Sequence, residues 1–122
     1  MQLPILGETI TAIDQIRDEE IIFHCKSGRS FKMYHEQDCC EYVSIEDITG
    51  DLQDLIGSPL LVAEEVGSEH QEKAEFVSET WTFYKFSTVK ASVTIRWYGT
   101  SNGYYSESVS FEEVKSNTTR RY

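Results

Sequence analysis

Hydrophobic and polar side chains alternate along much of this chain, and a two-residue period is typical of β-strands. The alternation is clearest over residues 91–112, where two alternating arms flank a Gly-Thr-Ser-Asn-Gly connection. We predict a β-hairpin here, closed by a three-residue loop at residues 101–103 whose glycine is left-handed. This register gives one nearly uniform apolar face, interrupted by Glu107 opposite Trp97. The apolar pairs on that face are Ile95 with Val109 and Val93 with Phe111.

The rest of the chain predicts a mostly β fold of the α+β class. Further strands are expected over residues 9–16, 20–26, 30–35, 60–66 and 80–86. Residues 20–26 and 30–35 form a hairpin around a Ser-Gly-Arg turn. Residues 41–48 are either a short strand or a helical turn. One short helix is expected over residues 50–57, because its leucines share a side and a glycine and Pro59 follow.

We therefore expect one antiparallel sheet of about six to seven strands with one short helix, in a single domain over residues 1–122. The polar stretch 67–79 is predicted to be a mobile loop, and residues 115–122 a frayed tail. The three cysteines, Cys25, Cys39 and Cys40, are odd in number and two are adjacent, so we expect reduced thiols rather than disulfides.

Charge and composition restrict the partners. Eleven basic residues against twenty-one acidic ones give a net charge of −10, which opposes binding to nucleic acid or to an anionic membrane. The chain has no long apolar run and no secretory leader pattern at its start, so we expect a cytoplasmic protein.

The second face of the predicted hairpin is the first candidate site, since it carries an arginine, an aromatic ring and several hydroxyls. The register of the preceding strand decides what it adds. If Phe86 pairs with Ala91, then Trp81 and Phe83 join the polar face; if Lys85 pairs with Val93, both aromatics join the core. The ordinary alternative is a solvated sheet face. The polar-face residues are Thr94, Arg96, Tyr98, Ser106, Ser108 and Ser110.

Three other clusters carry candidate chemistry. Arg29 lies in a basic turn that fits a phosphate, or is simply an exposed hairpin tip. His35, Asp38 and Cys39 are weak metal candidates, because no Cys-x-x-Cys pair or second histidine cluster completes a zinc site; a capped tight turn is the alternative. Acidic clusters at residues 47–54 and 64–79 suit an inhibitor that imitates nucleic acid, or serve solubility alone.

Several motifs resemble a family of small phage and bacterial proteins defined as a domain of unknown function. They are Met-Tyr-His-Glu-Gln-Asp-Cys-Cys-Glu from residue 33, Gly-Asp-Leu-Gln-Asp-Leu-Ile-Gly-Ser-Pro from residue 50, Trp-Thr-Phe-Tyr-Lys from residue 81, and Ile-Arg-Trp-Tyr-Gly through Ser-Asn-Gly-Tyr-Tyr-Ser-Glu-Ser to residue 108. More loosely, the chain is similar to viral sponge proteins, including the Thoeris anti-defence group, which sequester cyclic ADP-ribose or cyclic-nucleotide immune signals. That likeness implies homo-oligomers with pockets at subunit junctions.

The predicted function is a non-enzymatic sponge for a nucleotide-derived signal, without a cofactor. Useful sequestration needs sub-micromolar affinity, about −8 kcal/mol, so we expect two chains to share each pocket. An acidic inhibitor of a host protein and a metal-binding protein are the alternatives. In the sponge, Arg96 and Arg29 are expected to bind phosphates. Trp81, Phe83 or Tyr98 would stack on a base, and Asn102, Ser106 and Ser108 would form hydrogen bonds with sugar hydroxyls.

Overall fold

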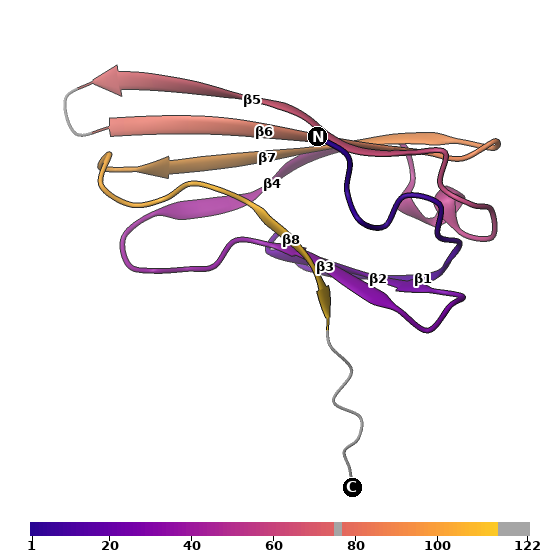
Figure 1. Cartoon of the computed structure of the whole chain (residues 1–122). Coiled ribbons are helices and arrows are strands. Elements are labelled where there is room, and N and C mark those ends of the chain that lie inside the picture. Colours follow the sequence, from indigo (N-terminus) through magenta and orange to yellow (C-terminus); the bar gives the residue numbers. More distant parts are fainter. Residues whose placement is uncertain (75–76, 115–122) are drawn as a thin grey trace, which may run out of the picture.

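Two four-stranded antiparallel sheets face each other in the computed structural model, which describes residues 1–74 and 77–114. One sheet has the order β1-β2-β3-β8 and the other the order β4-β7-β6-β5 (Figure 1). The strands are β1 Ile10–Ile16, β2 Glu20–Cys25, β3 Ser30–Tyr34, β4 Tyr42–Thr49, β5 Val62–Ala74, β6 Val77–Ser87, β7 Ser92–Ser101 and β8 Ser110–Val114, and η1 Leu52–Leu55 is a single 3-10 turn.

The core lies between the two sheets and follows from the alternation of each strand. Inward positions of both layers are buried, and they meet across the interface: the rings of Phe23 in β2 and Phe86 in β6 lie 5.3 Å apart. The indole Nε1 of Trp97 in β7 donates to Sδ of Met33 in β3 at 3.0 Å. Burial of these apolar side chains is the main force that holds the layers together.

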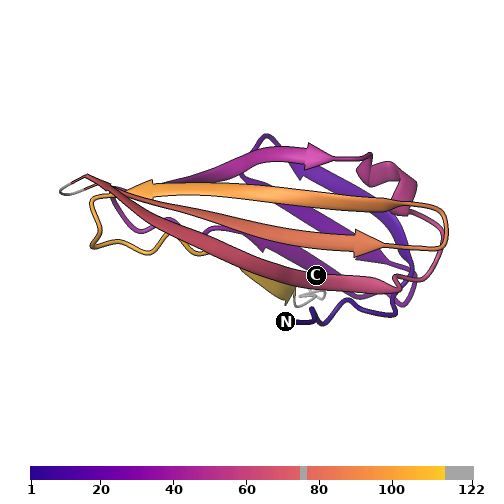
Figure 2. The same cartoon turned by 90° about the horizontal axis from the view of Figure 1, so that it is seen from above.

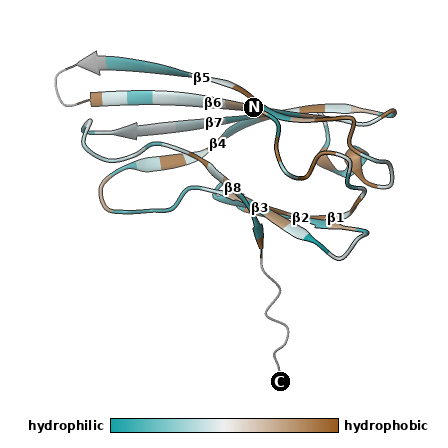
Figure 3. Ribbon diagram, in the orientation of Figure 1, coloured by the Kyte–Doolittle hydropathy of each residue, from teal (hydrophilic) through white to brown (hydrophobic). Residues whose placement is uncertain are grey.

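β5 and β6 form a hairpin that extends well beyond the opposite sheet (Figure 2). The inward positions of β6 change along this hairpin from aromatic to hydroxyl side chains. Phe86 and Tyr84 belong to the core, whereas Thr82, Thr80 and Ser78 follow at the same two-residue spacing towards the overhanging end. The overhanging part of β5 is coloured mainly as hydrophilic in Figure 3. The core therefore ends before the hairpin does.

The predicted fold class is confirmed: the chain is mostly β and antiparallel, with one short 3-10 turn in the region expected to be helical. The strand count is eight rather than six to seven, and they form two sheets rather than one. The hairpin of β2 and β3 is present, with its pairing running from Glu20 opposite Tyr34 to His24 opposite Ser30. Residues 42–49 are a strand, which settles the alternative left open there.

The predicted hairpin over residues 91–112 is wrong. β7 pairs with β4 and β6, while β8 lies in the other sheet and pairs with β3, so that Phe111 is opposite Met33. The reason is the packing of Phe111, whose ring approaches those of Phe23, Phe31 and Phe86 at 5.8 to 6.4 Å. Alternation identified the inward residues, but the second arm buries them in the opposite layer. Residues 102–109, here called the crossover segment, connect the two sheets (Figure 1).

Three further predictions need correction. Within the predicted loop 67–79, residues 67–74 and 77–79 belong to strands, because β5 and β6 pair there from Gly67 opposite Phe83 to Glu72 opposite Ser78, whereas residues 75–76 lie outside the described residues. Both proposed registers of β6 against β7 are off: Phe86 pairs with Val93, and this places the outward aromatics of β6 as the first alternative did. The predicted frayed tail, residues 115–122, lies outside the described residues.

The expectation of three reduced cysteines is also wrong, since Cys39 and Cys40 are joined in a disulfide while Cys25 is free and buried. Adjacent cysteines need no closed loop of chain to meet, so an argument from an odd cysteine count does not apply to them. Among the described residues, no helix is long and apolar enough to cross a membrane.

Candidate functional site

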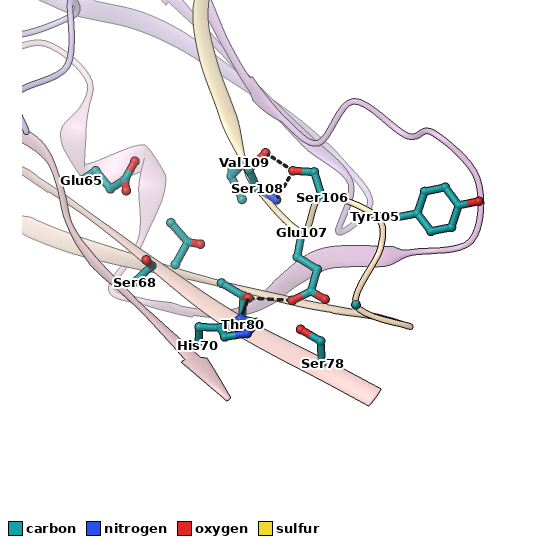
Figure 4. Close-up of a pocket in the computed structure, with 12 residues that line it drawn as sticks. Glu65, Ser68, His70, Ser78, Thr80, Tyr105, Ser106, Glu107, Ser108 and Val109 are labelled. Atoms are coloured by element: carbon teal, nitrogen blue, oxygen red, sulfur yellow. Dashed lines mark hydrogen bonds between the residues drawn. The ribbon is translucent and has the colours of Figure 1, made fainter. Parts of the chain in front are cut away.

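A polar cavity of about 350 Å³ lies on the inner side of the overhanging hairpin (Figure 4). One wall is the inward face of β5 and β6, and the other is the crossover segment, which passes beneath them. β5 contributes Glu65, Ser68 and His70, β6 contributes Ser78, Thr80 and Thr82, and the crossover segment contributes Gly103 and residues 105–109. Its volume is at the low end of the range of small-molecule sites.

Glu107 is the central side chain of this cavity. Its Oε1 accepts a hydrogen bond from the Thr80 hydroxyl at 2.6 Å, and its Oε2 accepts one from the Ser101 hydroxyl at 2.5 Å. The residue is only 8% exposed. Within the described parts of the chain, Glu107 forms no ion pair with a lysine, arginine or histidine. Two hydroxyls therefore hold a buried carboxylate in place without cancelling its charge.

His70 extends this network to the mouth of the cavity. Its Nδ1 lies 2.9 Å from the Thr80 hydroxyl oxygen. Because the single hydroxyl proton of Thr80 is donated to Glu107, Nδ1 of His70 must be the donor to Thr80.

Ser78 and Thr82 line the same cavity with hydroxyls that have no protein partner. The two residues are 4% and 6% exposed. Neither side chain makes a hydrogen bond to any other residue that the structure describes. Buried hydroxyls without partners are uncommon in native proteins, since water or a ligand normally satisfies them. These two groups mark the inner wall as a place where a polar molecule is held.

The crossover segment is positioned by close packing against β7. A Cβ atom built on Gly99 would lie 2.9 Å from Cβ and 3.2 Å from the carbonyl oxygen of Glu107, and 3.1 Å from Cγ2 of Val43. A residue with a Cβ atom at this position requires β4 or the crossover segment to move. At the inner end, the buried Tyr84 hydroxyl donates to the carbonyl of Val109 at 3.4 Å. Burial, followed by the nearby Glu65 carboxylate, raises the pKa of Tyr84 well above its usual range.

A buried histidine braces the outer side of the crossover segment. Nδ1 of His35 lies 2.6 Å from the carbonyl oxygen of Ser108, and Nε2 lies 2.6 Å from Oε2 of Glu41. Both partners only accept hydrogen bonds, because Glu41 is ionised, so both ring nitrogens carry protons. The backbone N–H of Asp38, then His35, lower the pKa of Glu41 to about 2, and the backbone N–H of Cys39 adds to this.

This geometry leaves the predicted metal candidates in other roles. His35 uses both ring nitrogens, Asp38 contributes a backbone N–H, and Cys39 is in the disulfide. No group of three or more potential metal ligands occurs in the part of the chain that the structure describes.

Four of the eight predicted ligand residues share the outer face of β6 and β7, where Trp81 is opposite Tyr98 and Phe83 is opposite Arg96. The rings of Trp81 and Tyr98 are 5.4 Å apart. Arg96 Nε is paired with Oε1 of Glu46 at 2.7 Å, with both side chains about two-fifths exposed. The predicted aromatic and arginine face exists, but its arginine already has an anionic partner.

The other four residues lie elsewhere. Arg29 is paired with Glu8 at 2.8 Å and with Glu113 at 3.0 Å, so its guanidinium is committed to carboxylates. Asn102 closes a turn by accepting from the N–H of Tyr104. Ser106 and Ser108 line the cavity and are hydrogen-bonded to each other at 2.7 Å. They lie on the opposite side of the sheet from Arg96, because β8 does not continue the hairpin.

Sequence reasoning missed the residues that define the cavity wall, although a signal for them was present. Ser78, Thr80 and Thr82 continue the inward positions of β6 after two aromatics, and Glu107 interrupts an apolar alternation. Polar residues at inward positions indicate that something other than the core faces them.

Taken together, the fold and this site define an all-β sandwich with a hydroxyl-lined, acidic cavity at one end. The chain belongs to the family described as Domain of unknown function (DUF7448), whose model matches residues 3–111. No curated protein and no solved structure matches the chain in the corresponding comparisons.

Proposed function

We propose that this protein is a non-enzymatic binder of a small, hydroxyl-bearing molecule, held in the cavity between the overhanging hairpin and the crossover segment. The observation that carries the proposal is the pair of buried hydroxyls, Ser78 and Thr82, which line the cavity without a hydrogen-bond partner among the described residues. An unsatisfied buried polar group costs roughly 1–3 kcal/mol. A ligand that bonds to both hydroxyls recovers that cost as binding free energy.

The arrangement of hydroxyls supports binding rather than covalent catalysis. A nucleophilic serine or threonine needs a base that takes its proton. The Thr80 proton is directed at Glu107, whose carboxylate also accepts from Ser101. The hydroxyls of Ser78 and Thr82 have no hydrogen-bonded base among the described residues. The cavity walls therefore provide hydrogen bonds without an activated nucleophile.

The narrower proposal is that the protein is phage-encoded and sequesters a cyclic nucleotide or cyclic ADP-ribose signal in the host cytoplasm. The ribose hydroxyls of such a signal suit this cavity. Its phosphates do not, since the described residues that line the cavity include Glu65 and Glu107 but no lysine or arginine. A nucleotide would therefore need cations from outside the cavity, and a second copy of the chain in a homo-oligomer is the proposed source.

A second candidate is an inhibitor that binds a basic host protein. The observation that favours it is the order of the acidic stretch, because Glu64 and Glu69 lie on a paired strand rather than on a loop. Carboxylates with fixed spacing present a defined charge pattern to a partner. Pull-down from a host lysate tests this: a partner captured by the native chain and lost with Glu64→Gln/Glu69→Gln supports it.

The decisive experiment for the binder is to heat-denature purified protein and identify released small molecules by mass spectrometry. Calorimetry against a panel of cyclic dinucleotides and cyclic ADP-ribose isomers then tests the narrower proposal. We expect binding to be weakened by Thr82→Val and retained in Thr94→Val, the same change on the outer face of the sheet. Loss of binding in Trp81→Ala and Arg96→Ala, with Thr82→Val unaffected, would move the site to the outer face.

A further inference from the structure

Resting on the proposed function, we infer that the cavity recognises a pair of neighbouring hydroxyl groups on a sugar ring, anchored at Glu107, and that it excludes phosphate. The inference concerns which part of a ligand enters, and it follows from the hydrogen-bonding capacity of three lining groups. These are the Glu107 carboxylate and the hydroxyls of Ser78 and Thr82.

Glu107 demands a donor. An ionised carboxylate accepts up to about four hydrogen bonds and donates none. Thr80 and Ser101 supply two of them, at 2.6 and 2.5 Å. The remaining lone pairs face a cavity whose lining, in residues 1–74 and 77–114, includes no lysine or arginine. A ligand must therefore present O–H or N–H groups at this point.

The two unpartnered hydroxyls require a ligand group that accepts hydrogen bonds as well as one that donates them. The hydroxyls of Ser78 and Thr82 each carry one proton to donate and lone pairs that accept. An ammonium group donates only, so it satisfies Glu107 but leaves both hydroxyl protons without an acceptor. A sugar hydroxyl donates to Glu107 and at the same time accepts from a neighbouring hydroxyl. Neighbouring hydroxyls on a ring therefore satisfy both the acceptor Glu107 and the two hydroxyls, which need an acceptor for their protons.

The spacing along β6 fixes where a ring lies. Thr80, which holds Glu107, is two residues from Ser78 on one side and two from Thr82 on the other. On a strand this separation is about 7 Å in each direction. A single ring over Glu107 reaches one of the two hydroxyls, and a further group on the ligand reaches the other. The cavity of about 350 Å³ accommodates a molecule longer than one ring.

A phosphate group does not match the hydrogen-bonding requirements of Glu107. At neutral pH its oxygens are anionic acceptors, which offer nothing to a carboxylate and are repelled by it. Glu65 lines the inner end of the cavity and adds a second carboxylate. Any phosphate on a ligand must therefore lie outside the cavity, away from Glu107.

The test is a titration of the ¹⁵N-labelled full chain with D-ribose, 2-deoxy-D-ribose, ribose 5-phosphate and 1,4-diaminobutane, followed by amide chemical shifts of residues 78–82 and 103–109. We expect D-ribose to bind, 2-deoxy-D-ribose to bind at least tenfold more weakly, and ribose 5-phosphate to bind no more tightly than ribose. Glu107→Gln should weaken ribose binding at least tenfold, because an amide replaces one acceptor oxygen with a donor.

The side-chain controls separate a binding role from a structural one. Ser78→Ala and Thr82→Val remove unpartnered hydroxyls, so they should weaken ribose binding without lowering the stability of the free protein. Thr94→Val should change neither. Equal binding of the deoxy sugar, tighter binding of the phosphate, binding of the diamine alone, or no shift with any sugar would overturn the inference. In each of these cases, a small molecule other than a sugar, released from the denatured protein, would still support the proposed function as a small-molecule binder while the inference about sugar hydroxyls fails.

Discussion

Substitution of Gly99 by alanine tests whether the crossover segment is packed as a wall of the cavity. Gly99 lies on the inward face of β7, opposite Thr80 of β6 and Val43 of β4. Its φ is not in the left-handed region, so alanine brings no backbone strain. The change therefore adds one methyl group between Val43 and Glu107 and nothing else.

The size of the effect follows from the distances. The new Cβ would lie 2.9 Å from Cβ of Glu107 and 3.1 Å from Cγ2 of Val43, whereas carbon atoms in good contact are about 3.5–4.0 Å apart. The crossover segment must therefore move by roughly 0.5–1 Å. Overpacking of this kind costs roughly 1–3 kcal/mol, and the lower entropy of the unfolded alanine chain offsets about 0.4–1 kcal/mol. The expected net loss is on the order of 1–2 kcal/mol, or roughly 4 °C in Tm per kcal/mol.

Denaturation in guanidinium chloride, followed by tryptophan fluorescence, measures the stability of Gly99→Ala against the parent chain. Thr94→Ala is the matched control, since it lies on the same strand but faces outward. In addition, Gly99→Ala should weaken ligand binding, because it displaces Glu107 from Thr80 and Ser101. A variant as stable as the parent, with amide shifts confined to residues 98–100, would refute the packing of Glu107 on β7.

Three other predictions use independent parts of the molecule. Glu41, with its pKa lowered to about 2, contributes stability that is present above its ordinary value near 4.5 and is lost as the pH falls towards 2; Glu41→Gln should flatten this acid limb in denaturation curves measured from pH 7 to pH 2.5. Burial, then Glu8, raises the pKa of Cys25 to about 11, so iodoacetamide at pH 8 should label it only after unfolding, and rapid labelling of the native chain would contradict this. Arg96→Ala, which breaks a half-exposed pair with Glu46, should cost less than about 1 kcal/mol and less still in 1 M salt, as measured by urea denaturation.

The sequence predicted local structure well and strand partners poorly. The alternation of Val93, Ile95 and Trp97 correctly identified their inward faces, because burial depends on the side of a strand. It did not reveal that Phe111 packs in the opposite layer, since pairing between distant strands depends on how two layers close. The long polar stretch of β5 does not have the pattern of a strand, because its outward and inward residues are both hydrophilic, which removes the alternation.

The candidate site was predicted in part. One of the two registers left open places Trp81 and Phe83 on the face of Arg96, as the structure has them, whereas the prediction that Ser106 and Ser108 share that face is wrong. Sequence reasoning could not predict the ion pairs of the charged side chains. Arg96 and Arg29 each pair with carboxylates from strands or loops that are distant in the chain. In a chain with excess acidic residues, a free arginine is the exception.

Glu107 explains both why the hairpin predicted over residues 91–112 does not form and why the proposed cavity does. In a hairpin of β7 and the following arm, its carboxylate would face Trp97 in an apolar layer, and burial of an unpaired charge there is strongly unfavourable. In the structure, the crossover segment leaves β7 after Ser101, opposite Ser78, and returns past the hydroxyl-lined part of β6, so Thr80 and Ser101 donate hydrogen bonds to the carboxylate instead. The same residue thus disfavours the hairpin and favours a polar cavity. An acidic residue that breaks an apolar alternation, next to a strand whose inward face becomes hydroxyl-rich, is a sequence signal for such a cavity.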